Sequence, residues 1–304
     1  MMGFHRHARF RRDGNFTPIK LTVRDTEIFR VVNRHRFLRA HQIADLIGGS
    51  RQQILRRLQS LFHHGYLERP LCQLDYFQRG GSQSIVHGLA SRGAAHLRRV
   101  ANIPFNHLHW TSRNCFVKRL FLEHALMVSD IMVALELACR KRGDVRLLIE
   151  HEIPLPAVTR NQRAPFQWIV IDSGKEKPGV IPDRVFALEF GNSERILCFL
   201  EADRGTMPIH RPRFAKSCFA RKFVAYEATW RCHIHTTRFG IKRLRVLAVT
   251  DNEERINHLR NACASLHAGH GIFLFSTRAR ITNALDALVE PWVETYGESL
   301  ALAA

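Results

Sequence analysis

Three amphipathic segments followed by a β-hairpin pattern constrain the fold of the first hundred residues more than any other feature. The first segment follows Thr22, which has an acidic residue, Asp25, three positions later, as is typical of a capped helix start. The third segment follows Ser50, with Gln53 three positions on, and is ended by Gly65. Helices are therefore expected over residues 22–33, 39–47 and 50–65.

The hairpin pattern lies directly after the third helix. A strand over residues 66–71, a glycine-containing turn over residues 78–82 and a return strand over residues 84–89 are expected, and a short helix follows over residues 91–100. Three helices followed by a hairpin is the order of a winged helix-turn-helix domain. The chain is thus expected to divide into a basic flexible arm over residues 1–20, a winged helix-turn-helix domain over residues 21–108 and an α/β domain over residues 109–304.

The charge of the chain favours a polyanionic partner. Its 304 residues include 46 Lys and Arg against 27 Asp and Glu, a formal net charge of +19. The excess is concentrated in residues 1–110, which carry 18 basic and 6 acidic side chains. Double-stranded DNA is the expected partner. No uncharged apolar run of about 18 residues is present, so no membrane contact is expected. Seven scattered cysteines without a C-x-x-C pair fit a cytoplasmic protein.

The third helix is the part of a winged helix that normally enters the major groove. Its start offers side chains able to form two-point hydrogen bonds with guanine or adenine, and the candidates for base contacts are Arg51, Gln52 and Arg56. Arg57 is the candidate for a phosphate contact, and Arg79 lies at the tip of the expected wing. The alternative is that these residues form a solvated helix face on a protein-interaction module.

Beyond residue 109, helical and extended patterns alternate. A long amphipathic helix is expected over about residues 115–140, and the capping pattern Thr250-x-x-Glu253 is expected to open a later helix. The other expected elements are a helix over residues 214–230 and strands over residues 147–155, 182–189, 196–201, 244–249 and 271–275. This alternation predicts a mixed α/β domain.

Acidic residues mark the middle of this second domain. Glu201 and Asp203 are two positions apart on an expected strand, so their side chains point to one face, and Asp183 on a neighbouring strand could join them. Three converging carboxylates would suit Mg²⁺ or Mn²⁺, which could activate water for phosphodiester cleavage. Lys222 could offset charge at the phosphate, and Tyr226 shares its helix face because the two are four positions apart.

The order of these residues resembles the PD-(D/E)xK nuclease superfamily. The resemblance implies a restriction-endonuclease-like fold with a mixed sheet, in which an initial helix adds another acid. The candidate catalytic residues are Asp183, Glu201, Asp203, Lys222 and Tyr226. Glu123 is the matching candidate for that additional metal ligand. One departure is that Asp203 occupies the usual position of the strand lysine, which puts activity in doubt. The alternative is a non-catalytic core in which the carboxylates bind arginines such as Arg184, Arg204 or Arg221.

The chain as a whole resembles the bacterial replication-relaxation family over about residues 20–250. The resemblance rests on the order and spacing of Leu21-Thr-Val-Arg-Asp25, Arg36-Phe-Leu, Gln42-Ile-Ala, Gly65-Tyr-Leu-Glu68, the segment 107–114 with Trp110, His124-x-x-x-Val-Ser-Asp130, Pro182-Asp183, Glu201-Ala-Asp-Arg-Gly-Thr206 and Lys222-x-x-x-Tyr226. It implies a protein of plasmids or other mobile elements that is needed for plasmid replication and for relaxation of plasmid DNA.

Three functions remain open from the sequence. The first is a non-enzymatic DNA-binding factor at a plasmid origin, for which a relaxase, a replication initiator or a second copy of the chain are candidate protein partners. The second is a metal-dependent endonuclease or nickase that uses Asp183, Glu201 and Lys222. The third is a transcriptional repressor whose second domain senses a ligand or dimerises.

Overall fold

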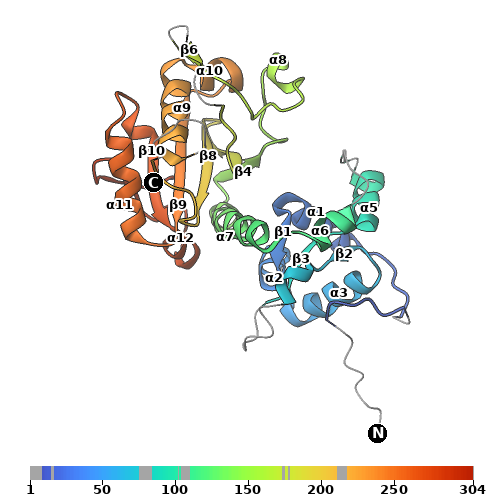
Figure 1. Cartoon of the computed structure of the whole chain (residues 1–304). Coiled ribbons are helices and arrows are strands. Elements are labelled where there is room, and N and C mark those ends of the chain that lie inside the picture. Colours follow the sequence, from blue (N-terminus) through green and yellow to red (C-terminus); the bar gives the residue numbers. More distant parts are fainter. Residues whose placement is uncertain are drawn as a thin grey trace. The chain divides into compact units, whose positions relative to one another are not determined.

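The computed structural model describes residues 9–14, 17–74, 84–101, 103, 110–172, 175–176, 179–210 and 218–303. The chain divides into two compact units, Met1–Ser129 and Asp130–Ala304, which we call unit 1 and unit 2 (Figure 1). Its architecture is mixed α and β, with a three-stranded sheet in unit 1 and a seven-stranded sheet in unit 2.

Unit 1 begins with helices around a small antiparallel sheet. Its helices are α1 (Val23–His35), α2 (Ala40–Ile47), α3 (Arg51–His63), α5 (Ser91–Ala101), α6 (Trp110–Cys115) and the first part of α7 (Arg119–Arg142). Its strands are β1 (Phe37–Arg39), β2 (Leu67–Glu68) and β3 (Val86–Leu89), in the order β1-β3-β2. A 3-10 turn, Leu71–Gln73, follows β2. The expected turn over residues 78–82 lies outside the described residues.

The starts of α1 and α3 are those that the sequence predicts. Thr22 caps α1 by accepting a hydrogen bond from the Asp25 backbone N–H, while the Asp25 side chain accepts one from the Thr22 backbone. Ser50 caps α3 through the backbone N–H of Gln53. These caps fix where each helix begins, and therefore which side chains face the core.

The segment before α1 contacts unit 1 in its described part. The Arg12 guanidinium donates to the Phe62 carbonyl at 3.0 Å and to the Glu68 carboxylate at 2.6 Å. The Asp13 backbone N–H donates to Nδ1 of His63 at 3.0 Å. Residues 9–14, which the sequence assigns to a flexible arm, are therefore connected to the end of α3 and to β2.

Unit 2 is built on a mixed seven-stranded sheet in the order β12-β11-β10-β9-β8-β7-β4. The strands are β4 (Val145–Ile149), β7 (Arg184–Phe190), β8 (Arg195–Asp203), β9 (Arg243–Thr250), β10 (Phe273–Thr277), β11 (Trp292–Glu294) and β12 (Ser299–Leu300). The central strands β8, β9 and β10 are parallel, and the outer pairs are antiparallel. A separate hairpin pairs β5 (Ile171–Asp172) with β6 (Lys175–Glu176).

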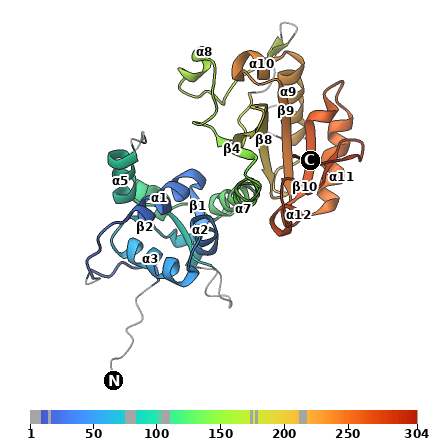
Figure 2. The same cartoon turned by 180° about the vertical axis from the view of Figure 1, so that it is seen from behind.

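One face of this sheet is covered by helices. The helices α9 (Phe219–Arg231) and α11 (Glu253–Ala264) contact each other and lie along the sheet (Figures 1 and 2). The apolar core between helices and sheet includes Leu197 and Phe199 of β8. The shorter helices are α8 (Ala157–Arg160), α10 (Ile234–Phe239) and α12 (Arg278–Asn283).

Several element boundaries differ from the sequence predictions for local reasons. The long helix expected over residues 115–140 is instead α7, which begins at Arg119, while Cys115 ends the separate helix α6. The predicted capping box at Thr250 is wrong, because Thr250 is the last residue of β9. Asn252 caps α11 instead, and its side chain accepts the Arg255 backbone N–H at 2.8 Å.

Candidate functional site

The first turns of α3 present polar side chains to solvent. Arg51, Gln52 and Arg56 are all exposed, while Ile54 and Leu58 are buried beneath them. The helix therefore has one side fixed in the core and one side available to a partner. Arg79, which the sequence assigns to the wing tip, lies outside the described residues.

Arg57 differs from its neighbours because its guanidinium is held inside unit 1. Its Nε donates to Oδ1 of Asp25 at 2.7 Å and its terminal nitrogen to Oδ2 at 2.6 Å. The same terminal nitrogen donates to the Lys20 carbonyl at 2.7 Å. Arg57 thus connects α3 to the start of α1, through a partner 32 positions away that the sequence pattern does not indicate.

Asp25 is the buried half of this ion pair. Burial alone would raise the pKa of Asp25, but hydrogen bonds from Arg57 and Thr22 outweigh burial and hold the pKa below its usual value. The carboxylate has no solvent exposure. It is therefore charged at neutral pH and depends on Arg57 for compensation.

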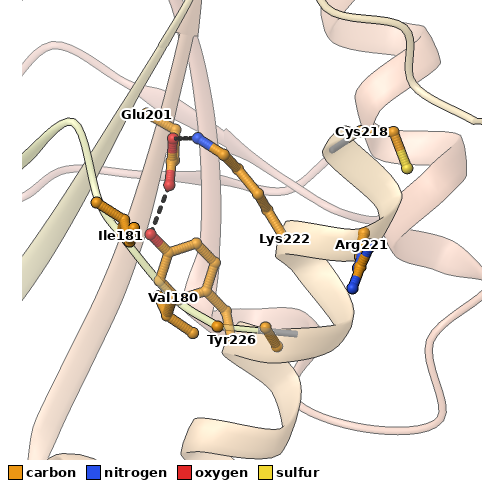
Figure 3. A pocket seen from close by; sticks show the side chains of 9 residues that line it. Val180, Ile181, Glu201, Cys218, Arg221, Lys222 and Tyr226 are labelled. Atoms are coloured by element: carbon orange, nitrogen blue, oxygen red, sulfur yellow. Dashed lines mark hydrogen bonds and ion pairs between the residues drawn. The ribbon is translucent and has the colours of Figure 1, made fainter. Parts of the chain in front are cut away.

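Glu201, one of the predicted acidic site residues, lies on the face of the unit 2 sheet that the helices cover. Glu201 follows Leu197 and Phe199 in the alternation of β8 and is buried. The Lys222 ammonium donates to Oε2 of Glu201, and the Tyr226 hydroxyl donates to Oε1 at 2.5 Å (Figure 3). The four-residue spacing on α9 places both donors on the side that faces β8.

Asp203 and Asp183 lie next to this group. Oδ2 of Asp203 accepts from Nε of Arg255 at 2.5 Å, and Oδ1 accepts from the Gly205 backbone N–H at 2.8 Å. Oδ2 of Asp183 accepts from the Ala202 backbone N–H at 2.9 Å. The structure therefore brings the predicted residues Asp183, Glu201, Asp203, Lys222 and Tyr226 together in one cluster, which we call the carboxylate cluster.

Arg255 is the member of this neighbourhood that sequence reasoning missed. It lies on α11, 52 positions after Asp203, and no motif connects the two. The arginine partners that the sequence suggests are Arg184, Arg204 and Arg221. Arg184 pairs with Glu150 at 3.4 Å. Only the parallel β8–β9 connection and the packing of α11 bring Arg255 to the end of β8.

The protonation states follow from burial and from the crowding of charges. Burial, reinforced by the charge of Asp183, raises the pKa of Glu201 to about 7, although Lys222 and Tyr226 oppose the rise. Burial lowers the pKa of Lys222, but the charges of Glu201, Asp183 and Asp203 outweigh it, and the net shift is upward. Burial and the Glu201 charge raise the pKa of Tyr226 well above its usual value. Lys222 is therefore charged and Tyr226 neutral at physiological pH.

The described arrangement does not fit a magnesium ion. Mg²⁺ needs carboxylate oxygens that are open to it in near-octahedral geometry. Both oxygens of Glu201 and both of Asp203 already accept hydrogen bonds from protein donors. Glu123, the predicted additional ligand, pairs with Arg119 at 2.7 Å. Within the described ranges, no group of three His, Cys, Asp or Glu side chains is arranged to hold a metal ion.

A cavity of about 230 Å³ opens beside the cluster. Its walls are residues 179–181, Glu201 and the facing side of α9, including Lys222 and Tyr226. Figure 3 shows Lys222 and Tyr226 turned toward Glu201 and Arg221 turned away from it. The cavity gives small molecules or water access to one side of the buried ion pair.

The sequence matches the profile of the replication-relaxation family over residues 29–244, more than half of the chain. The chain belongs to the replication-relaxation family. Comparisons with curated proteins and with solved structures give no match. Membership in this family confirms the resemblance found in the sequence and supports a role in replication or relaxation.

The matched range includes α3 and the carboxylate cluster, whereas Asp25 and Arg255 lie outside it. Both outlying residues supply ion-pair partners to residues within the range. Of the helices in the described part of the chain, none is sufficiently long and apolar to span a lipid bilayer.

Proposed function

We propose that this chain is a non-enzymatic DNA-binding protein that acts in plasmid replication and in relaxation of plasmid DNA. In this proposal unit 1 is a winged helix-turn-helix domain that binds an origin-type site in double-stranded DNA. Three supports are the family membership, the order α1-β1-α2-α3-β2-β3 with its antiparallel strand pairs, and the net charge of +19. Unit 2 then contacts a protein partner, such as a relaxase or replication initiator, or a second copy of the chain.

The observation that carries the proposal is the exposed start of α3. Arg51, Gln52 and Arg56 share the solvent side of a helix whose other side is buried. Arginine pairs with guanine and glutamine with adenine through two hydrogen bonds in the major groove. Arg57 is not included among the base or phosphate contacts, because Asp25 holds it. Arg79 stays the proposed wing contact.

A binding experiment tests this proposal. The variant Arg51→Ala/Arg56→Ala should weaken binding to an origin duplex by about 1–3 kcal/mol per lost base contact and reduce its preference over a scrambled duplex. Fluorescence anisotropy at several salt concentrations measures both quantities. The matched control is Arg146→Ala/Arg243→Ala, which removes two exposed arginines from unit 2 that are paired with glutamates. Equal binding by both variants and the wild type would place the DNA contact elsewhere.

A metal-dependent endonuclease is the second candidate, favoured by the position of Glu201 and Lys222 beside a cavity and by the charge of Asp183, which acts on both. It would need Mg²⁺ or Mn²⁺ to displace the present donors. Supercoiled plasmid incubated with the protein and either metal should stay supercoiled if the carboxylate cluster is structural. Nicking by the wild type that is lost in Asp183→Ala and Glu201→Ala would establish the enzyme and overturn the non-enzymatic proposal.

A repressor would use the same helix α3 for a different site. It predicts footprint protection at a promoter and no effect on replication of the host plasmid. Protection at the origin, together with loss of plasmid maintenance in Arg51→Ala/Arg56→Ala, would support the replication function instead.

A further inference from the structure

A second basic surface of unit 1 lies on α5 and does not include the residues assigned to base contacts. It is a groove of about 600 Å³ that we call the α5 groove. Its lining consists of Leu21, Tyr66, Arg92, Ala95, His96, Arg98 and Arg99. Three of these are arginines, and among the described residues no acidic side chain lines the groove.

One wall of the groove is fixed by contacts within unit 1. The guanidinium carbon of Arg92 lies 4.7 Å from the centroid of the Tyr66 ring, and the same guanidinium donates a hydrogen bond to the His64 carbonyl at 2.8 Å. A Cβ atom at Gly93 would lie 2.4 Å from the Tyr66 carbonyl oxygen, which shows how closely α5 approaches this segment. The positions of Arg92 and Tyr66 are therefore set before any ligand binds.

Arg98 and Arg99 form the open wall. Both are exposed in the last turn of α5, and in the part of the chain that the structure describes neither forms an ion pair. His96 adds no further charge to the groove. Burial and the positive charge of Arg99 lower the pKa of His96, so the His96 ring is neutral at physiological pH. The groove thus keeps an uncompensated positive charge next to a planar aromatic ring.

The α5 groove is connected to α3 through the segment before α1. Leu21 lines the groove, and the preceding residue, Lys20, accepts a hydrogen bond from Arg57 of α3 through its carbonyl. His96 is joined to Thr26 of α1 by a hydrogen bond of 2.9 Å. The groove and α3 therefore belong to one packed body, so a duplex bound at α3 has a fixed relation to the groove.

We propose that the α5 groove binds backbone phosphates of the DNA duplex that α3 contacts. This inference rests on the proposed DNA-binding function. Arginine is suited to this role because its planar guanidinium donates two parallel hydrogen bonds to phosphate oxygens. Such contacts position the protein on the duplex without reading its sequence. The groove therefore contributes affinity and orientation, and α3 contributes sequence preference.

Salt dependence separates the two surfaces. Each phosphate contact adds a slope of about −0.9 to the plot of log K against log salt concentration for duplex DNA. Arg98→Ala/Arg99→Ala should therefore flatten the slope by about 2 units and weaken binding equally for origin and scrambled duplexes. Arg98→Gln/Arg99→Gln, which keeps long polar side chains on the helix, should give the same flattening because it also removes both charges. The Arg146→Ala/Arg243→Ala control should keep the wild-type slope.

The outcomes are distinguishable. Wild-type protein that binds neither duplex would overturn the DNA-binding function and the groove inference together. A second outcome is that the wild type binds DNA and Arg51→Ala/Arg56→Ala weakens this binding, while both Arg98/Arg99 variants keep the wild-type salt slope. This outcome would overturn the groove inference alone. A loss of origin preference in Arg98→Ala/Arg99→Ala would also contradict the inference, because a phosphate contact carries no sequence information.

Discussion

Replacement of Arg57 by alanine tests whether this residue holds unit 1 together. The substitution leaves the fully buried Asp25 carboxylate without two charge-assisted hydrogen bonds of 2.6 and 2.7 Å. Removal of one partner of a buried ion pair costs about 3–5 kcal/mol. Because 27 % of the Arg57 side chain is exposed, we expect Arg57→Ala to lower the free energy of unfolding of unit 1 by an amount near the lower end of this range, about 3 kcal/mol.

Amide hydrogen exchange in the full-length protein measures this loss locally. Arg57→Ala should lower the opening free energy of α1 and α3 and leave that of α9 unchanged. The double variant Asp25→Ala/Arg57→Ala should recover part of the loss, because no unpaired buried charge remains. The pair contributes at neutral pH and is lost as the pH falls below the usual Asp value of 3.8, since the folded-state pKa of Asp25 is lowered.

The opposite pattern would refute this reasoning. If Arg57→Ala keeps the wild-type exchange rates in α1 and α3 but flattens the salt dependence of DNA binding, the side chain is a phosphate contact. The Asp25 pair would then contribute little to stability.

Two further predictions concern buried positions. Because the pKa of Glu201 rises from 4.5 to about 7 on folding, the free energy of unfolding should fall by on the order of 3 kcal/mol as the pH rises across that interval. Urea titrations should show this fall in the wild type and its absence in Glu201→Gln; matching profiles would contradict it. Gly93→Ala should cost about 1–3 kcal/mol, because its Cβ meets the Tyr66 carbonyl. An unchanged melting temperature would show that α5 can move away.

Local chemistry made the helices of unit 1 predictable. Thr22 and Ser50 carry capping hydrogen bonds within three residues, so the sequence pattern alone locates the starts of α1 and α3. The three-residue strand β1 carries no comparable pattern, because it is defined only by pairing with β3 almost fifty positions later. Asn252 was likewise missed as the cap of α11, because Thr250 offered a similar spacing and only the end of β9 decides between them.

The candidate sites show the same division between local and distant contacts. The spacing of Glu201 and Asp203, and that of Lys222 and Tyr226, place each pair on one face of its strand or helix. Which donors occupy the carboxylates depends on packing between elements far apart in sequence. Arg255 illustrates this, because it lies 52 positions after Asp203 and still donates a hydrogen bond to that carboxylate, which no spacing in the sequence indicates.

Hydrogen exchange of the wild-type protein with and without an origin duplex tests the central claim most directly. The account predicts slower exchange in the first turns of α3, around Arg51, Gln52 and Arg56, with additional protection at the end of α5 around Arg98 and Arg99. The protection should decrease as salt is added. Protection confined to unit 2, with α3 unchanged by the duplex, would contradict the proposal that α3 binds DNA.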